Sequence, residues 1–374
     1  MRLLDRYLLR ELLLPLGMCQ GGFLVFWAAF DLLANLSDWQ KDKMTGGDIF
    51  QYYIVTTPGV LIIILPVALL LALLYALTHH AKHNEITAMR AADIGLWRLA
   101  MPYLLVGFVF SVLTLGVSEW VVPKAEDRAE ELRMRRLRTP GERVDRNIIH
   151  GLTFDNGRAR RSWYVGAYDL DNNEMATVQV GWRRPDGTIA RLFADRGVYT
   201  NGCWVFHDNV KILRQSSLTN SLLYTEVETN RLVMGDFTEP PEALRSEVRV
   251  SRSIGMRVKQ ADIPIADLLD YLRFHPRLTD RKYAWLHTKL HGRLAAPWTC
   301  LVVVLIAIPF GAQSGRRNVF FGVAGSIFIG FAYFVLMQVG LAMGSGGILP
   351  PWLAAWLPNF CFGLLSFFLI ARVR

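Results

Sequence analysis

The sequence predicts an α-helical membrane protein with six transmembrane helices and one inserted antiparallel β domain. Two observations carry this prediction. The chain is 52% hydrophobic and yet 20% charged, so the two kinds of residue must be segregated along it, and they are. Between the third and the fourth apolar span lies a charged segment, residues 119–293, that is long enough for one soluble domain.

The apolar stretches match the thickness of a bilayer, which a helix of about 20 apolar residues crosses. The last stretch is too long for one helix, and the Gly- and Pro-rich segment GSGGILPP (344–351) divides it into two spans. The stretches without Asp, Glu, Lys or Arg are residues 12–30, 49–78, 99–118, 294–315 and 318–371. We therefore expect three transmembrane helices in residues 1–122, the inserted domain with flanking helices in residues 123–285, and three transmembrane helices in residues 286–374.

Basic residues concentrate on one side of these spans, which the positive-inside rule assigns to the cytoplasm. They are Arg2, Arg6, Arg10, Lys82, Arg90, Arg98, Arg316, Arg317, Arg372 and Arg374. Both termini are then cytoplasmic, and the inserted domain lies outside. This topology largely explains the net charge of +9. The basic run RMRRLR (133–138) follows an acidic run, which is typical of a solvated helix, so we expect no nucleic-acid partner.

The inserted domain contains segments rich in aromatic and β-branched residues between Trp163 and Leu213, separated by the turn sequences DNNE, RPDG and NG. This pattern predicts an antiparallel sandwich or an open barrel, with a hairpin at Asn201-Gly202. Two interpretations of its aromatic residues stay open: each one singly favours a place in a small core, whereas a rolled sheet of this size could hold an acyl chain. These residues are Trp163, Tyr168, Trp182, Tyr199, Trp204 and Phe206.

Motifs for catalysis are lacking in the sequence. The segment GAQSGRRN (311–318) does not have the Gly-Lys-Ser/Thr ending of a nucleotide-binding P-loop. His287 and His291 have a spacing that suits zinc, but the glutamate of an HExxH motif and an evident third ligand are missing. We expect no catalytic residue, no metal site and no cofactor.

The stretch HHAKHNEITAMRAADIGLW (79–97) lies between the second and third spans and predicts a helix over about 84–93. Asn84 is expected to cap this helix, and Glu85 suits its first turn. Ile86, Met89, Asp93 and Trp97 recur near one face. A helix this short is marginal by itself, so we expect it to dock on the cytoplasmic ends of the spans or on a partner.

The segment NEITAMRAADIGLWRL resembles the signature that follows the second span in the LptF/LptG (YjgP/YjgQ) family of lipopolysaccharide export permeases. Other segments agree in order along the chain. They are LLDRYLLRELLLP at the start, LPVALLLALLYAL in the second span, SEWVVP after the third, LHGRLAAPW entering the fourth and LPPWLAAWLPN entering the sixth. The form of SEWVVP favours LptG over LptF.

This resemblance implies a transmembrane subunit of an ABC transporter that extracts lipopolysaccharide from the inner membrane and passes it to a periplasmic bridge. The partners it implies are an LptB-like ATPase dimer in the cytoplasm, a paralogous LptF- or LptG-like permease, and LptC- and LptA-like bridge proteins. The inserted domain would be a periplasmic β-jellyroll. The chain itself would not be an enzyme.

The resemblance also implies roles for individual residues. The helix after the second span would couple the permease to the ATPase, with Glu85 as the acidic contact. The predicted coupling residues are Asn84, Glu85, Ile86, Met89, Arg90 and Asp93. Asp93 departs from the family, which commonly has glycine there. Spans 1 and 5 would line the lipid cavity, and the predicted lipid-binding residues are Phe26, Trp27, Phe30, Lys41, Lys43, Phe321, Phe328 and Phe331.

A function of another class stays open beside this one. A membrane-anchored envelope enzyme could act on glycans or lipids through the inserted domain. It would need an acid/base or nucleophile site, for which the candidates are Asp155, Asp195, His207 and Asp208. A scaffold that transports nothing is a third hypothesis.

Overall fold

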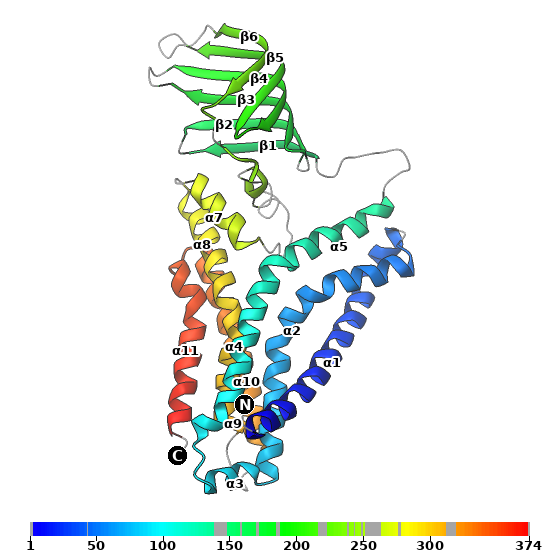
Figure 1. Ribbon diagram of the computed structural model, residues 1–374, viewed down its shortest axis with the longest axis vertical. Helices are drawn as coiled ribbons and strands as arrows, with labels where there is room; N and C mark the ends of the chain where they lie inside the picture. Colours follow the sequence, from blue (N-terminus) through cyan, green and yellow to red (C-terminus); the bar gives the residue numbers. More distant parts are fainter. Residues whose placement is uncertain are drawn as a thin grey trace. The chain divides into compact units, whose positions relative to one another are not determined.

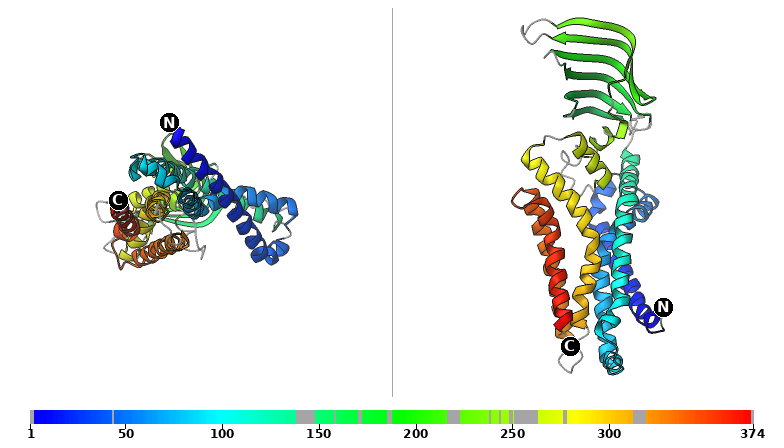
Figure 2. Two further views of the ribbon diagram at one scale, coloured as in Figure 1. Left: turned by 90° about the horizontal axis from the view of Figure 1, so that it is seen from below. Right: turned by 60° about the vertical axis from the view of Figure 1, so that its left-hand side comes forward.

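The computed structural model forms two compact units (Figures 1 and 2), which we describe separately. The helical unit comprises Met1–Thr139 and Asp280–Arg374, and the β unit comprises Pro140–Thr279. The residues that the structure describes are 3–42, 44–137, 148–157, 159–169, 172–184, 188–215, 223–237, 239–242, 244–247, 250, 263–275, 278–311 and 319–372.

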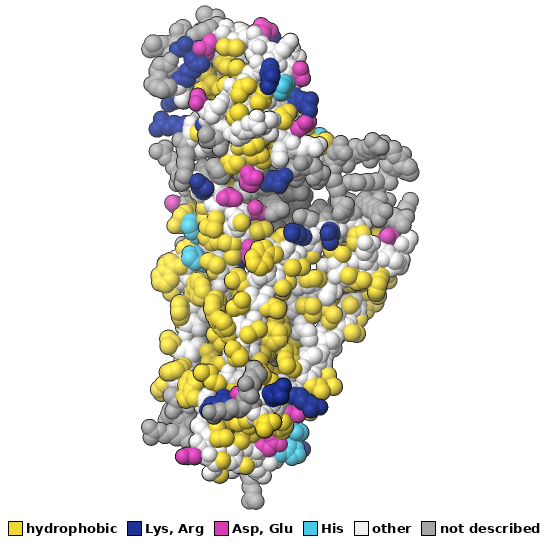
Figure 3. Space-filling view, in the orientation of Figure 1, with side chains coloured by type: hydrophobic (Ala, Val, Ile, Leu, Met, Phe, Trp, Pro, Cys, Tyr) yellow, Lys and Arg dark blue, Asp and Glu magenta, His cyan; other side chains and the backbone are white. Residues whose placement is uncertain are grey.

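The helical unit contains the six predicted membrane spans. Each is long and apolar enough to cross a bilayer, and the fourth runs from Asp280 to Pro309 through three consecutive helical segments. The elements are α1 (Leu3–Lys41), α2 (Gly46–Lys82), α3 (Glu85–Ala91), α4 (Leu96–Trp120), α5 (Val122–Leu137), α8 (Asp280–Ala295), η1 (Ala296–Trp298), α9 (Thr299–Gly311), α10 (Val319–Ser345) and α11 (Pro351–Arg372). On the face shown in Figure 3, hydrophobic side chains form a broad belt along these helices.

The limits of the helical unit differ from the boundaries expected at residues 123 and 285. Helix α5 and the first part of α8, which the sequence prediction grouped with the inserted domain, belong to the helical unit. The reason is local packing: α5 follows α4 almost directly and lies against α2, while α8 packs against α10 and α11.

Leucine and alanine side chains form the core of the helical unit. Leu8, Leu12 and Leu16 recur every four residues on α1, so they share one face. They pack with the buried residues of α2, α4 and α9 in a single cluster. Because lipid tails are as apolar as leucine, close packing rather than escape from water holds such helices together.

Two glycines allow α10 and α11 to approach closely. A Cβ atom at Gly340 would lie 2.5 Å from the carbonyl oxygen of Ala354, and one at Gly344 would lie 2.6 Å from the Ala354 Cβ. Spaced four residues apart, they make the GxxxG pattern of tight helix pairs in membranes. A polar chain reinforces the contact: Tyr333 donates to Asn359 Oδ1 at 2.6 Å, and Asn359 Nδ2 donates to the Ala295 carbonyl at 3.0 Å.

The β unit is built on one open, curved sheet whose six strands follow one another in sequence order, each antiparallel to the next (Figure 1). The predicted inserted antiparallel domain is thus confirmed. Its strands are β1 (Ile148–Asn156), β2 (Arg161–Asp169), β3 (Glu174–Arg183), β4 (Ile189–Thr200), β5 (Cys203–Gln215) and β6 (Leu223–Met234), and a helix, α7 (Ile265–Phe274), follows later in the chain. The Asn201-Gly202 hairpin is also confirmed, with both residues at positive φ and Thr200 paired with Cys203.

The inner face of the sheet is a filled core. Trp163, Tyr168, Trp204 and Phe206 are fully buried, which is the core interpretation of these aromatics, while Trp182 and Tyr199 are partly buried at its edge. Phe237, which follows β6, inserts its ring among them, 5.3 Å from the ring of Trp163. The chain after β6 therefore covers part of this apolar face.

A buried carboxylate fixes that covering segment. The Glu239 side chain is fully buried, accepts a hydrogen bond from Asn156 Nδ2 at 2.8 Å and lies 3.2 Å from the Arg161 Nε. Its backbone carbonyl accepts from the Trp204 indole at 2.7 Å. Because an unpaired charge inside a protein is costly, these contacts hold the segment across three strands.

Replacing Gly340 with valine should separate α10 from α11. The added methyl groups would collide with the Ala354 backbone, at a cost of roughly 1–3 kcal/mol for an overpacked contact. Thermal unfolding of the purified protein in detergent should then begin at a lower temperature. Gly363→Val on α11 is the matched control, because nothing lies within 4 Å of a Cβ atom added at that position. An unchanged midpoint for Gly340→Val would contradict the close contact.

Candidate functional site

The connection between α2 and α4 contains the short helix that the sequence predicts over about 84–93. The structure has it as α3, from Glu85 to Ala91. Asn84 stands directly before it with a left-handed φ of 57°, and its side chain makes no cap hydrogen bond. Asn84 thus stands at the predicted N-cap position. Its side chain does not cap the helix, because an asparagine at this φ serves as the turn between two helices and does not take the extended conformation of a capping residue.

The end of α3 is a Schellman motif with Asp93 at its left-handed position. The Asp93 N–H donates to the Arg90 carbonyl at 3.0 Å, and the Ile94 N–H donates to the Met89 carbonyl at 3.2 Å. Asp93 has a φ of 65°. Met89 and Ile94 both pack against the core of the helical unit, which supplies the hydrophobic contact that accompanies this motif.

One face of α3 is docked on the bundle and the other is exposed. Ile86 is only 4% exposed, and Met89 packs against the core cluster. A cavity of about 20 Å³, the size of one water molecule, lies under the helix beside Ile86, His80 and Tyr103. The exposed residues on or next to the opposite face are Asn84, Thr87, Ala88, Ala91, Ala92 and Asp93, and Arg90 is half-buried.

The Glu85 carboxylate is bound by two residues from two different spans. The Tyr7 hydroxyl on α1 lies 3.1 Å from Oε1 and 2.9 Å from Oε2, and His80 Nδ1 on α2 lies 2.7 Å from Oε2. Burial would raise the pKa of Glu85, but the hydrogen bonds from His80 and Tyr7 and the nearby His79 and His80 outweigh it and leave this pKa below its usual value. Glu85 is therefore ionised at neutral pH and accepts both bonds.

A second contact ties the start of α1 to the start of α4. Arg98 Nη2 lies 2.8 Å from Asp5 Oδ1 and donates to Oδ2 at 3.1 Å. Together with the Tyr7 contact, it joins the first turns of α1 to both ends of the α2–α4 connection. Charged side chains gather at this end of the helical unit in Figure 3.

The C-terminal ends of α4 and α8 are joined by another ion pair. Arg293 Nη2 lies 3.0 Å from Glu119 Oε1, Arg293 Nε donates to the same oxygen at 3.0 Å, and Nη2 also donates to the Ser118 carbonyl at 2.9 Å. Both side chains are largely buried. Paired charges of this kind fix the relative position of two spans that are far apart in the sequence.

The predicted lipid-binding aromatics divide into exposed and packed residues. Phe26 and Phe30 on α1, and Phe328 and Phe331 on α10, are between 66% and 73% exposed. Trp27 is half-buried, with its ring edge-on to Tyr53 at 5.6 Å. The side chain of Phe321, and Lys43 as a whole, lie outside the described residues.

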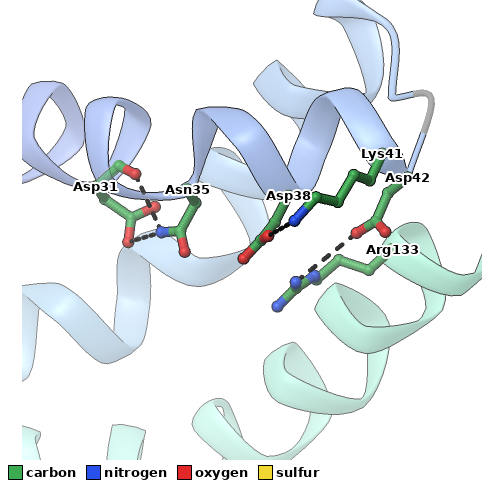
Figure 4. A network of polar contacts seen from close by, with 6 residues as sticks. All are labelled: Asp31, Asn35, Asp38, Lys41, Asp42 and Arg133. Atoms are coloured by element: carbon green, nitrogen blue, oxygen red, sulfur yellow. Dashed lines mark hydrogen bonds and ion pairs between the residues drawn. The ribbon is translucent and has the colours of Figure 1, made fainter.

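Acidic residues surround the predicted phosphate contact at the end of α1 (Figure 4). Lys41 Nζ lies 3.3 Å from Asp38 Oδ1, and both side chains are mostly exposed. Asn35 Nδ2 donates to Asp31 Oδ1 at 2.9 Å. Beyond them, Asp42 pairs with Arg133 of α5 at 3.7 Å. An anion approaching Lys41 must compete with Asp38, although an exposed pair of this kind is worth little.

The candidates for an enzyme site do not assemble into catalytic machinery. Asp155 lies on β1, away from the others, and Asp195 Oδ2 accepts a hydrogen bond from Asn209 at 2.6 Å. His207 and Asp208 line an open cavity of about 370 Å³ on the outer face of the sheet, beside the Arg196–Glu174 ion pair. Among the described residues, His207 makes no side-chain hydrogen bond to a nucleophile or a carboxylate, and no group of three metal-ligating residues occurs.

Comparison with known proteins gives the family. Residues 6–372 match the family "Lipopolysaccharide export system permease LptF/LptG". The chain belongs to the LptF/LptG family. It is similar to the lipopolysaccharide export system permease protein LptG of Escherichia coli K12 and to that of Escherichia coli O6:H1, with 20% identity in each case over 91% of this chain and 89% of the relative.

The segments that carry the resemblance to the LptF/LptG family contact one another in the helical unit. The first segment contributes Asp5 and Tyr7, which bind Arg98 and Glu85 of the second-span signature. SEWVVP contributes Glu119, which binds Arg293 of LHGRLAAPW. Asn359 of LPPWLAAWLPN donates to Ala295 of the same segment.

Sequence reasoning missed Tyr7, His80, Asp5 and Arg98 as site residues in this LptF/LptG protein. Tyr7 and Asp5 are 78 and 93 residues away from their partners. For Asp5, Tyr7 and Arg98, the signal in the sequence was their presence in two segments that resemble the family, whereas His80 lies outside both segments. Nothing in the spacing of either segment indicates that the two meet.

Asp93 has a left-handed φ, which gives a physical reason for the glycine that the family resemblance implies at this position. We expect Asp93→Gly to leave the end of α3 intact. Asp93→Val should destabilise it by about 1–2 kcal/mol, because a β-branched residue fits poorly at positive φ. Hydrogen exchange of the Ile94 and Asp93 amides measures this directly. Equal protection in the valine and glycine variants would contradict the motif.

Proposed function

We propose that this chain is the transmembrane subunit of an ABC transporter that extracts lipopolysaccharide from the inner membrane and passes it to a periplasmic bridge. The observation that carries the proposal is the docked helix α3 in a lipopolysaccharide export permease whose sequence lacks a P-loop. Moving a lipid out of a bilayer costs roughly 0.8 kcal/mol per exposed methylene. A separate ATPase must supply that energy through a mechanical contact.

The basic residues at the α3 end of the helical unit support a cytoplasmic position for α3 and for both termini. The β unit then lies in the periplasm. In this arrangement the helical unit supplies the membrane spans and the β unit supplies the periplasmic domain, with α5 and the first part of α8 as its flanking helices.

We assign the exposed side of α3 to an LptB-like ATPase dimer. Ile86 and Met89 face the bundle and hold the helix in place, so they support the docking surface from beneath. Thr87, Ala88 and Asp93 are exposed and face outward, beside the half-buried Arg90. Small side chains at the centre allow a groove of the ATPase to approach the helix backbone closely.

The exposed aromatic faces of α1 and α10 support a lipid cavity shared with a second permease. Helix α1 packs chiefly against α2, which leaves Phe26 and Phe30 open on its other side. Phe328 and Phe331 are equally open on α10. A paralogous LptF- or LptG-like subunit would complete the walls of the cavity, and Lys41 and Lys43 would meet the lipid phosphates.

The sheet of the β unit supports contact with LptC- and LptA-like bridge proteins. Within the described residues, β1 and β6 are edge strands that pair on one side only. Such edges can accept a strand from another sheet. Continuing one sheet into the next would make a path between the two membranes.

Site-specific crosslinking tests the assignment of α3. A photoreactive residue at Thr87 should yield an adduct with the ATPase in the purified complex, because this position is exposed on the proposed docking surface. The same residue at Trp120 serves as the control, since it is 75% exposed at the far end of α4. Adducts of equal yield from both positions, or from neither, would contradict the coupling role.

The lipid-binding face is tested in the same way. A photoreactive residue at Phe30 should give a lipopolysaccharide adduct that increases when ATP is supplied. Leu364 on α11 is the matched position, because it is 69% exposed but lies on a helix outside the proposed cavity. If Phe30 gives no ATP-dependent adduct, the chain does not transport lipid along α1, and a scaffold role gains support.

A further inference from the structure

We propose that Tyr7 and His80 are positioning residues for α3, holding Glu85 so that α3 moves together with α1 and α2. The inference rests on the proposed function of α3 as the contact with the ATPase. It gives Glu85 a role inside this chain, where the family resemblance alone treats it as a contact with the partner.

Both oxygens of the Glu85 carboxylate are already engaged within the chain. Tyr7 reaches Oε1 and Oε2 with one hydroxyl, at 3.1 and 2.9 Å, and His80 Nδ1 reaches Oε2 at 2.7 Å. An ionised carboxylate only accepts hydrogen bonds, so His80 carries a proton on Nδ1. Hydrogen bonds to an ionised group are short and strong, and they fix the direction of the Glu85 side chain.

The position of His80 makes this contact specific. Its side chain is 1% exposed. The Tyr7 ring lies 5.5 Å from the imidazole ring, so the two side chains that donate to Glu85 also pack against each other. A buried polar side chain is costly unless it has a hydrogen-bond partner. Among the described residues, the hydrogen bond to the Glu85 carboxylate is the contact that offsets the cost of burying the His80 side chain.

Helix α3 is too short to hold its own orientation. Seven residues form about two turns, which is far below the length at which a helix is stable alone. Its first turn is fixed by Glu85 and the buried Ile86, and its end by Met89 and Ile94. Met89 and Ile94 pack against a core cluster that includes Leu8 and Leu12 of α1, and the Glu85 contact adds a polar link to Tyr7 of the same helix.

The Tyr7 contact connects α3 to the helix that carries the exposed aromatic face. Helix α1 is continuous from Leu3 to Lys41, with Tyr7 near its start and Phe26 and Phe30 further along. The Asp5–Arg98 pair ties the same turns to α4. A displacement of α3 by the ATPase would therefore pull on α1 directly and reach the proposed lipid cavity along one helix.

Hydrogen exchange on the full-length chain tests the positioning role without any transport assay. In Tyr7→Phe and in His80→Leu, the amides of residues 85–91 should exchange roughly tenfold faster, because a charge-assisted hydrogen bond is lost. His80→Asn should restore slow exchange, because its amide nitrogen stands close to the place of Nδ1. The control is Tyr75→Phe, which removes a hydroxyl from an exposed tyrosine on the same helix as His80.

A double variant separates a direct contact from general loosening. If Tyr7 acts through Glu85, adding Tyr7→Phe to Glu85→Gln should accelerate exchange less than the sum of the two single changes. Exchange that is unchanged in both Tyr7→Phe and His80→Leu, or accelerated equally in Tyr75→Phe, would overturn the proposal.

The purified complex with its ATPase gives the functional readout. In Tyr7→Phe the lipid released per ATP hydrolysed should fall by roughly fivefold or more, the scale of a typical coupling between sites, while the ATPase stays bound. If the wild-type chain binds no ATPase, the proposed function fails, and the exchange data still decide the positioning role. If the wild-type complex transports lipid and the variants exchange normally, the positioning role fails alone.

Discussion

Polar contacts between helices are the interactions on which the helical unit depends. In a solvent of lipid tails, apolar side chains gain little by leaving the solvent, so leucine packing alone does not fix which helix lies beside which. The ion pairs Asp5–Arg98 and Glu119–Arg293 and the Tyr7–Glu85 and Asn359–Ala295 hydrogen bonds do fix it. They lie between segments that are far apart in the sequence, and the GxxxG contact of α10 with α11 then sets how closely two spans approach.

The transmembrane part of the fold is predictable from sequence because of one simple constraint. A span in lipid must satisfy its own backbone and exclude charge, so the five stretches without charged residues, the last of them divided in two, locate the six spans. The Asn201-Gly202 hairpin is predictable for a similar reason, since few residues tolerate its backbone conformation. For the inner-face aromatics of the β unit the sequence left a core or an acyl-chain site open, and the structure has them in a core.

Other features depend on contacts that no local pattern records. Nothing near Phe237 or Glu239 indicates that they cover the sheet, because their partners lie on β1, β2, β3 and β5. Glu85 looked like an exposed acid in the first turn of a helix, and only its distance to Tyr7 and His80 shows that it is held from within. At Asp93, the resemblance to the family implies a glycine, and the positive φ of this residue gives the physical reason for a glycine there.

The length of the first two helices has a consequence for what the aqueous phase can reach. Helix α1 has 39 residues and α2 has 37, so they are about 58 Å and about 55 Å long at 1.5 Å per residue, whereas the hydrocarbon layer is only about 30 Å thick. Even when they are tilted, α1 and α2 must extend beyond the hydrocarbon layer. A capping box between Thr45 and Asp48 begins α2 just after the turn that joins the two helices. Part of the α1–α2 hairpin therefore lies outside the hydrocarbon layer, and Lys41, at the end of α1, has a mostly exposed side chain.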